Sequence, residues 1–205
     1  MAIACFVFFY RLNKLKSNEK VIYYAKYFFL LMGIATTWGG IIGHMFLYVF
    51  EDGKAWKVPG WVISMLSIML MERVAIEHNR VLLSKKIINV LRVVNVIEFL
   101  LFLFLAMYYL NFSFVEAHSA YGLMVVVMTL EAILYYKMKN DASKFMLWGV
   151  GLAAIAAVIF TFDLSPHPWF NHMALSHMFM LAATWFFFRG VTKIDMSDAK
   201  AAKED

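Results

Sequence analysis

The chain of 205 residues has a single cysteine, Cys5, and only three prolines. One cysteine excludes an internal disulfide and any metal or iron–sulfur site built from several thiolates. Charged residues make up 16% of the chain, against about a quarter in soluble domains. No basic segment precedes the first apolar run and no small-residue cleavage site follows it, so we expect no secretory signal peptide.

Hydrophobic residues, in contrast, make up 63% of the chain, and the mean hydropathy is +0.70. A hydrocarbon core needs about 20 apolar residues per helical crossing, and six of the seven apolar segments reach that length. The sequence therefore predicts an all-α, polytopic transmembrane bundle of seven helices, the first of them short. We expect one transmembrane domain, residues 1–190, followed by a polar tail, residues 191–205. The seven segments are residues 1–11, 21–50, 58–76, 87–110, 117–136, 145–163 and 170–188.

Lysine and arginine are unevenly distributed between the loops. They gather after the first, third, fifth and seventh segments, whereas residues 111–116 and 164–169 contain none. Because positive loops stay in the cytoplasm, this pattern predicts an outside N-terminus and a cytoplasmic C-terminal tail. The positive charge is thus explained by topology, and we expect no nucleic-acid partner. We expect an integral protein of a bacterial inner membrane or its equivalent, in contact with membrane lipids. A homo- or hetero-oligomer is left open.

Five of the six histidines fall in the outer half under this topology: His44, His118, His167, His172 and His177. At 1.5 Å per residue, His44 and His177 lie about 9 and 11 Å below the outer ends of their helices. Two histidines at matched depth on different helices can share a metal ion or a ligand, and His118 or His172 is a candidate third member. The alternative is that each histidine makes an isolated hydrogen bond between helices or lies in the wet interface.

Other ionisable residues inside the apolar segments gave weaker expectations. Glu98 lies deep in the fourth segment and needs a partner, because charge within a bilayer is costly. Glu72 and Glu77 stand beside Arg73 and Arg80, which predicts a solvated ion-pair face. Glu131 is close enough to Lys137 to reach the inner interface.

Seven helices, an outside N-terminus, a histidine near the end of the second helix and histidines on the seventh resemble the CREST superfamily. This superfamily comprises transmembrane hydrolases of the alkaline-ceramidase and adiponectin-receptor type. The resemblance implies that His44 and His177 bind Zn²⁺, and the candidate third members from the depth argument, His118 and His172, would be further ligands. It also implies hydrolysis of a lipid amide or ester, with Glu51 or Asp52 as the catalytic carboxylate.

The motifs depart from those of that superfamily at specific positions. Its seventh helix carries HxxxH, whereas here His172 and His177 are five residues apart and Met173 occupies the fourth position before His177. Gly40 stands four residues before His44, where the superfamily has a serine. The seventh segment also resembles that of an uncharacterised bacterial seven-helix family whose last helix carries a similar "NH…SH" pattern.

Two other classes of function stay open. A haem b redox protein needs two facing histidines at equal depth with small residues beside them, and His44 opposite His177 or His118 meets that requirement. A membrane receptor, transporter or complex subunit without enzymatic activity is the third class. A retinal protein is not expected, because the seventh segment has no lysine for a Schiff base.

Overall fold

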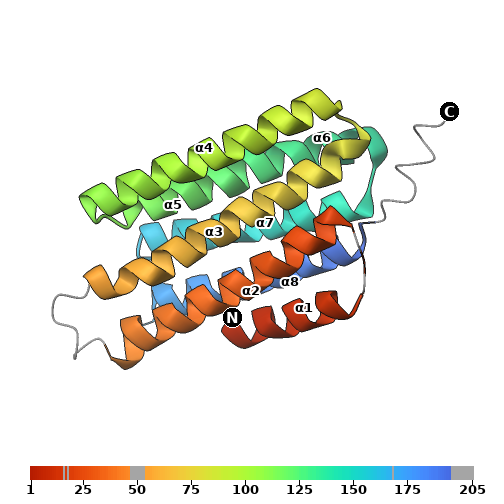
Figure 1. Ribbon diagram of the computed structural model, residues 1–205. Helices are drawn as coiled ribbons and strands as arrows, with labels where there is room; N and C mark the ends of the chain where they lie inside the picture. The colour runs from red at the N-terminus through yellow and green to blue at the C-terminus, as the bar shows by residue number, and fades with distance from the viewer. Residues whose placement is uncertain (16, 18, 47–53, 168, 195–205) are drawn as a thin grey trace.

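A computed structural model describes residues 1–194 except residues 16, 18, 47–53 and 168, and for residues 43, 44 and 54 it describes the backbone alone. Within these residues the chain is helical and forms no strand; one isolated β-bridge joins His167 and Phe170. The π-helical η3 joins α5 to α6 without a break, so the described residues form seven helical rods (Figure 1). The helices are α1 (Ala2–Lys14), α2 (Lys20–Gly40), α3 (Lys54–His78), α4 (Lys85–Tyr109), α5 (Ser113–Ala120), α6 (Met128–Met138), α7 (Asp141–Thr161) and α8 (His172–Thr192), with η1 (Ile41–Met45), η2 (Asn79–Val81) and η3 (Tyr121–Val127) extending or joining them.

Polar residues in the short connections set where several helices begin and end. Asn140 caps α7 by accepting from the amide of Ala142 at 2.6 Å, and Asn171 caps α8 by accepting from the amide of Ala174 at 3.1 Å. Side-chain oxygens at this position satisfy amides that have no partner within the helix. Lys139 has a φ of 52° and ends α6 with a left-handed turn, which reverses the chain within two residues.

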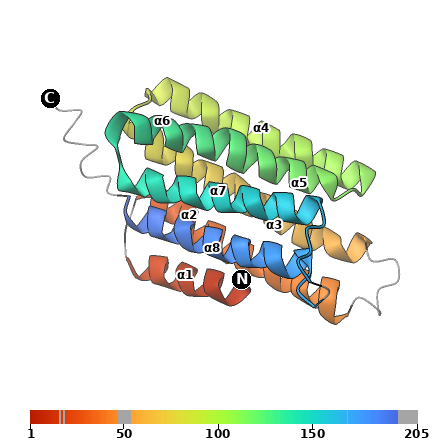
Figure 2. The same ribbon diagram turned by 180° about the vertical axis from the view of Figure 1, so that it is seen from behind.

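Successive rods run antiparallel, so alternate connections lie at the same end of the bundle. The connections from α1 to α2, from α3 to α4 and from α6 to α7 all lie at the end where α8 finishes (Figures 1 and 2). We call this the basic end, because the positively charged segments of the sequence are there. α1 spans only about half of the bundle, since 13 residues of helix measure about 20 Å. α1 and α4 lie at opposite edges of the molecule.

The core consists of two apolar clusters that meet on α3. The larger cluster includes Phe29, Met71 and Phe187, and it joins residues of α1, α2, α6, α7 and α8 to one side of α3. The smaller cluster includes Met65 and Phe99, and it packs α4 and α5 against α3. α3 is therefore the helix through which the two halves of the bundle are joined.

Five of the helices are long and apolar enough to cross a membrane. The spans are Ala55–Val81, Lys85–Tyr109, Ser113–Met138, Asp141–Thr161 and His172–Thr192. They confirm the prediction of a multi-pass helical membrane protein, and α1, with 13 residues, is the short first helix that the sequence predicted. The second predicted segment was also expected to cross the membrane, but α2 (Lys20–Gly40) is not among the five spans found in the described residues.

Candidate metal centre

Three ionisable side chains from three membrane-spanning helices come together inside the bundle. Glu72 lies on α3, Glu98 on α4 and His118 on α5, with exposed fractions of 0%, 8% and 0%. One potential ligand atom of each lies within 4.8 Å of those of the other two. In the described part of the chain, this is the only group of three or more histidine, cysteine or carboxylate side chains close enough to share a metal ion.

His118 is held through both of its ring nitrogens. Nε2 lies 3.0 Å from the backbone carbonyl of Met65, which can only accept, so Nε2 donates its proton there. Nδ1 lies 2.6 Å from Oε1 of Glu98. The rings of Phe99 and Phe102 lie 6.0 and 5.8 Å from the imidazole, centre to centre. A carbonyl that takes the proton of one nitrogen leaves the other oriented as a ligand, the usual arrangement in metal-binding histidines.

The carboxylate of Glu72 has a partner for only one of its oxygens. Asn95 on α4 donates to Oε2 of Glu72 at 3.0 Å, and the same amide nitrogen lies 3.3 Å from the carbonyl of Met69. Among the described residues, Oε1 of Glu72, Oε2 of Glu98 and Oδ1 of Asn95 find no hydrogen-bond partner although they are buried. An unsatisfied buried polar atom costs about 1–3 kcal/mol. The two unpartnered carboxylate oxygens belong to the residues clustered with His118 and favour a bound cation.

The π-helical η3 begins three residues after His118 and brings a glycine against Glu72. A Cβ atom on Gly122 would lie 2.6 Å from Oε1 of Glu72 and 2.6 Å from Cγ2 of Ile68. π-helical turns within α-helices are frequent at functional sites, where they change the direction of side chains. Gly122 thus allows α3 to approach η3 closely enough for Glu72 to reach the level of His118.

We expect Gly122→Ala to destabilise the protein by about 1–3 kcal/mol, because the added methyl group must displace Glu72 or Ile68. Thermal unfolding followed by circular dichroism in detergent measures the effect. Gly151→Ala on α7 is the matched control, since nothing lies within 4 Å of its added Cβ and alanine favours the helix. Equal stability of the two variants would contradict the close approach at Gly122.

Glu77, one and a half turns further along α3 than Glu72, lies in a separate polar group that it forms with arginine side chains. Arg92 on α4 donates to Oε1 of Glu77 through Nε at 2.7 Å and also through Nη2, and Nη1 of Arg80 lies 3.4 Å from Oε2. Nη2 of Arg73 donates to the carbonyl of Arg92 at 2.8 Å. The predicted ion pairing holds for Glu77 with Arg80, but the prediction that this face is solvated is wrong: Glu72 and Glu77 are fully buried, because α4 and η3 pack against α3 here.

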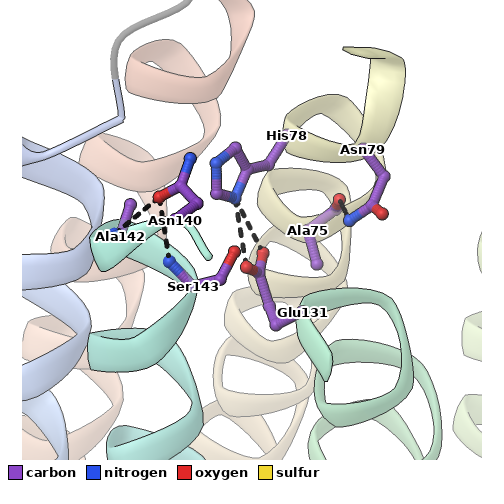
Figure 3. A network of polar contacts seen from close by, with 7 residues as sticks. All are labelled: Ala75, His78, Asn79, Glu131, Asn140, Ala142 and Ser143. Carbon is purple, nitrogen blue, oxygen red and sulfur yellow. Dashed lines mark hydrogen bonds and ion pairs between the residues drawn. The ribbon is translucent and has the colours of Figure 1, made fainter. Parts of the chain in front are cut away.

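A second buried pair lies where α3 meets α6, towards the basic end (Figure 3). Nδ1 of His78 lies 3.1 Å from each oxygen of Glu131, and the two side chains are 2% and 0% exposed. Figure 3 shows Ser143 of α7 directed towards the same carboxylate, and its buried Oγ has no hydrogen-bond partner among the described residues. The prediction that Glu131 reaches the inner interface is therefore wrong, because its carboxylate faces His78 inside the bundle.

Of the four histidines predicted as metal ligands, the described side chains bring His118 alone into the cluster. His177 is exposed on α8, where its Nδ1 lies 2.6 Å from the carbonyl of Met173 one turn earlier. Nε2 of His172, at the start of α8, lies 3.3 Å from Asp163. These two histidines are thus engaged locally and lie away from the cluster.

The remaining predicted residues fall where the structure gives no side-chain description. His44 lies in η1, of which the backbone is described at this position, and the pairing of His44 with His177 stays a prediction. Glu51 and Asp52, predicted as catalytic carboxylates, lie outside the described residues.

Glu72 and Asn95 were not recognised as site residues from the sequence. Glu98 did carry a signal, because an acidic residue so deep in an apolar segment needs a partner, and His118 is that partner. No sequence spacing links residues 72, 98 and 118, since each belongs to a different helix.

A comparison with protein families matches residues 1–196 to a family described as of unknown function (DUF6962). The chain belongs to this family. No curated protein and no solved structure matches the chain. The function of the family is unknown, so the resemblance to the CREST superfamily stays a prediction and the site has to be interpreted from its own chemistry.

Proposed function

We propose that the protein is a multi-pass membrane protein with a divalent metal centre formed by Glu72, Glu98 and His118. The observation that carries the proposal is the convergence of three potential ligand atoms within 4.8 Å, together with two carboxylate oxygens that have no partner in the described structure. Ionisable residues inside a membrane bundle are costly and usually mark a functional site.

The charges of the donor set match a divalent cation. Two ionised carboxylates and a neutral imidazole carry a charge of −2, which one divalent ion neutralises, and Nε2 of His118 is already committed to the carbonyl of Met65. A mixture of imidazole and carboxylate ligands suits zinc better than magnesium or calcium, which prefer oxygen alone. Zinc is therefore our first candidate metal.

Zinc held by three protein ligands leaves a position for water and activates it for hydrolysis. The lipid amide or ester hydrolase implied by the resemblance to the CREST superfamily would be consistent with such a centre. Two hollows of about 560 and 270 Å³ lie elsewhere, one between α1 and α2 and the other between α7 and α8, and neither is lined by the three ligands. The geometry thus supports metal binding, and the hydrolase remains a proposal from the resemblance.

The haem b alternative has less support. In the described part of the bundle, the buried group around His118 consists of two carboxylates, Glu72 and Glu98, whereas a bis-histidine haem site needs a second imidazole. A receptor, transporter or complex subunit would be compatible with the same metal centre.

For the orientation in the membrane, we propose that the basic end faces the cytoplasm. The grouping of the positively charged connections at that end supports this orientation.

Metal content tests the proposal directly. The full chain, purified without a histidine tag and dialysed against zinc, is expected to hold one zinc ion per chain by elemental analysis. Glu72→Gln keeps the size and the bond from Asn95 but removes a ligand charge, so we expect at least a tenfold loss of zinc affinity. An absence of bound zinc in the wild-type chain, or an unchanged affinity in Glu72→Gln, would contradict the site.

The double variant His44→Ala/His177→Ala serves as the control, because it removes the pair favoured by the sequence and leaves the buried cluster intact. We expect it to bind zinc like the wild type. Loss of zinc in the double variant with retention in Glu72→Gln would place the metal at the sequence-predicted pair instead.

A further inference from the structure

A hollow on the surface between α7 and α8 lies at the basic end of the bundle. Its volume is about 270 Å³, and it lies where α7 begins and α8 ends. This volume is just under the range of about 300–1,000 Å³ typical of small-molecule sites, so it would suit a compact polar group better than a large ligand. Its lining residues are Asp141, Lys144, Phe145, Trp148, Phe186 and Lys193.

Positively charged side chains lie along one side of this hollow, and they outnumber the single acidic side chain there. Lys144 and Lys193 line it, and Nζ of Lys193 lies 3.4 Å from Oδ2 of Asp141. Arg189, one turn before Lys193 on α8, stacks over the ring of Phe145 at 5.8 Å. Three positive groups against one carboxylate leave a net positive charge, which favours an anion.

Aromatic side chains form the other side and extend from the basic end towards the middle of the bundle. Trp148 is one turn further along α7 than Lys144, is 58% exposed and packs near Phe186, with ring centres 6.4 Å apart. Phe186 also lies 6.0 Å from Phe145. Since α7 and α8 are long and apolar enough to cross a membrane, this exposed aromatic surface faces the bilayer, next to the cations.

We infer that this hollow binds the headgroup of an anionic phospholipid. The lysines attract the phosphate, and the aromatic surface accommodates the start of the acyl chains. Basic pockets between transmembrane helices at the cytoplasmic surface are suited to such headgroups. A free phosphate would use the cations alone and would leave the aromatic surface unused. The inference does not depend on the proposed metal centre, which lies on α3, α4 and α5.

Native mass spectrometry of the full chain in detergent tests the site, using phosphatidylglycerol and phosphatidylcholine with identical acyl chains. We expect the wild type to bind one phosphatidylglycerol more tightly than any phosphatidylcholine. The variant Lys144→Gln/Lys193→Gln is expected to bind phosphatidylglycerol about tenfold to thirtyfold more weakly, because each lysine near the surface contributes about 1 kcal/mol.

The control variant is Lys137→Gln/Lys139→Gln, which removes the same charge at the same end of the bundle but outside the hollow. It is expected to keep the affinity of the wild type, and both variants should unfold at the temperature of the wild type. Equal losses in the two variants would show a general charge effect and overturn the site. Equal binding of the two lipids, or displacement of phosphatidylglycerol by millimolar inorganic phosphate, would also overturn it.

Discussion

Replacing Glu98 by leucine is expected to lower the free energy of unfolding by about 3–5 kcal/mol. The substitution leaves Nδ1 of His118 without the carboxylate that now lies 2.6 Å away, in a site where His118 is fully buried. Breaking a buried pair by removing one partner is costly, because the remaining group keeps its desolvation penalty and loses its compensation. Chemical or thermal unfolding in detergent, in the presence of a chelator, measures the loss.

The double variant Glu98→Leu/His118→Phe separates this pairing from a simple loss of packing. With both polar partners replaced by apolar groups, we expect most of the lost stability to return, as at other buried pairs. His172→Ala is the control, since its contact with Asp163 is partly exposed and worth about 1 kcal/mol or less. A double variant as unstable as the sum of the two single variants would show that the pair is not coupled.

The second large effect is expected at Glu131, whose replacement by leucine should cost about 3 kcal/mol or more. The carboxylate is fully buried and lies 3.1 Å from Nδ1 of His78, so its removal leaves the imidazole without an acceptor at the junction of α3 and α6. The unfolding transition of the variant in detergent, compared with that of the wild type, measures this cost.

Ser143→Ala is the matched control at the same junction. Its hydroxyl is buried beside Glu131 without a hydrogen-bond partner among the described residues, so we expect its removal to be neutral or slightly stabilising. If Ser143→Ala were as unstable as Glu131→Leu, the hydroxyl would be part of the pairing. A Glu131→Leu variant as stable as the wild type would contradict the buried ion pair.

Both buried pairs depend on α3, which gives the helix a role beyond packing. It supplies Glu72 and the carbonyl of Met65 to the candidate metal centre, Glu77 to the arginine group and His78 to the second pair. Polar interactions of this kind specify which helices are neighbours, because an apolar surface alone would pack against any other. α3 therefore determines how α4, α5 and α6 are arranged around it.

The number and order of the helices could be predicted from local properties of the chain. Long apolar runs, polar connections and capping residues act over one or two turns, and the seven predicted segments correspond to the seven rods. The predicted length of the second segment, residues 21–50, was less accurate. α2 ends at Gly40 and continues as the π-helical η1, and residues 47–50 lie outside the described structure.

The candidate site was predictable only in part, for a physical reason. Depth along a helix can be counted from the sequence, and the depth of Glu98 correctly indicated that this carboxylate needs a partner. The direction of a side chain around the helix and the choice of neighbouring helices depend on packing between segments far apart in the chain. Glu72 illustrates this: its neighbours suggested a solvated ion pair, whereas α4 buries it beside His118.

By itself, therefore, the sequence determined that this is a multi-pass helical membrane protein with a short first helix and positive charge at one end. Those properties follow from hydropathy and charge, which are sums over local segments. Only the tertiary structure decided that Glu72, Glu98 and His118 converge and that His78 meets Glu131. These side-chain contacts depend on how α3, α4, α5 and α6 are rotated relative to one another. Close contacts between helices, such as that of Gly122 with Glu72, determine this rotation.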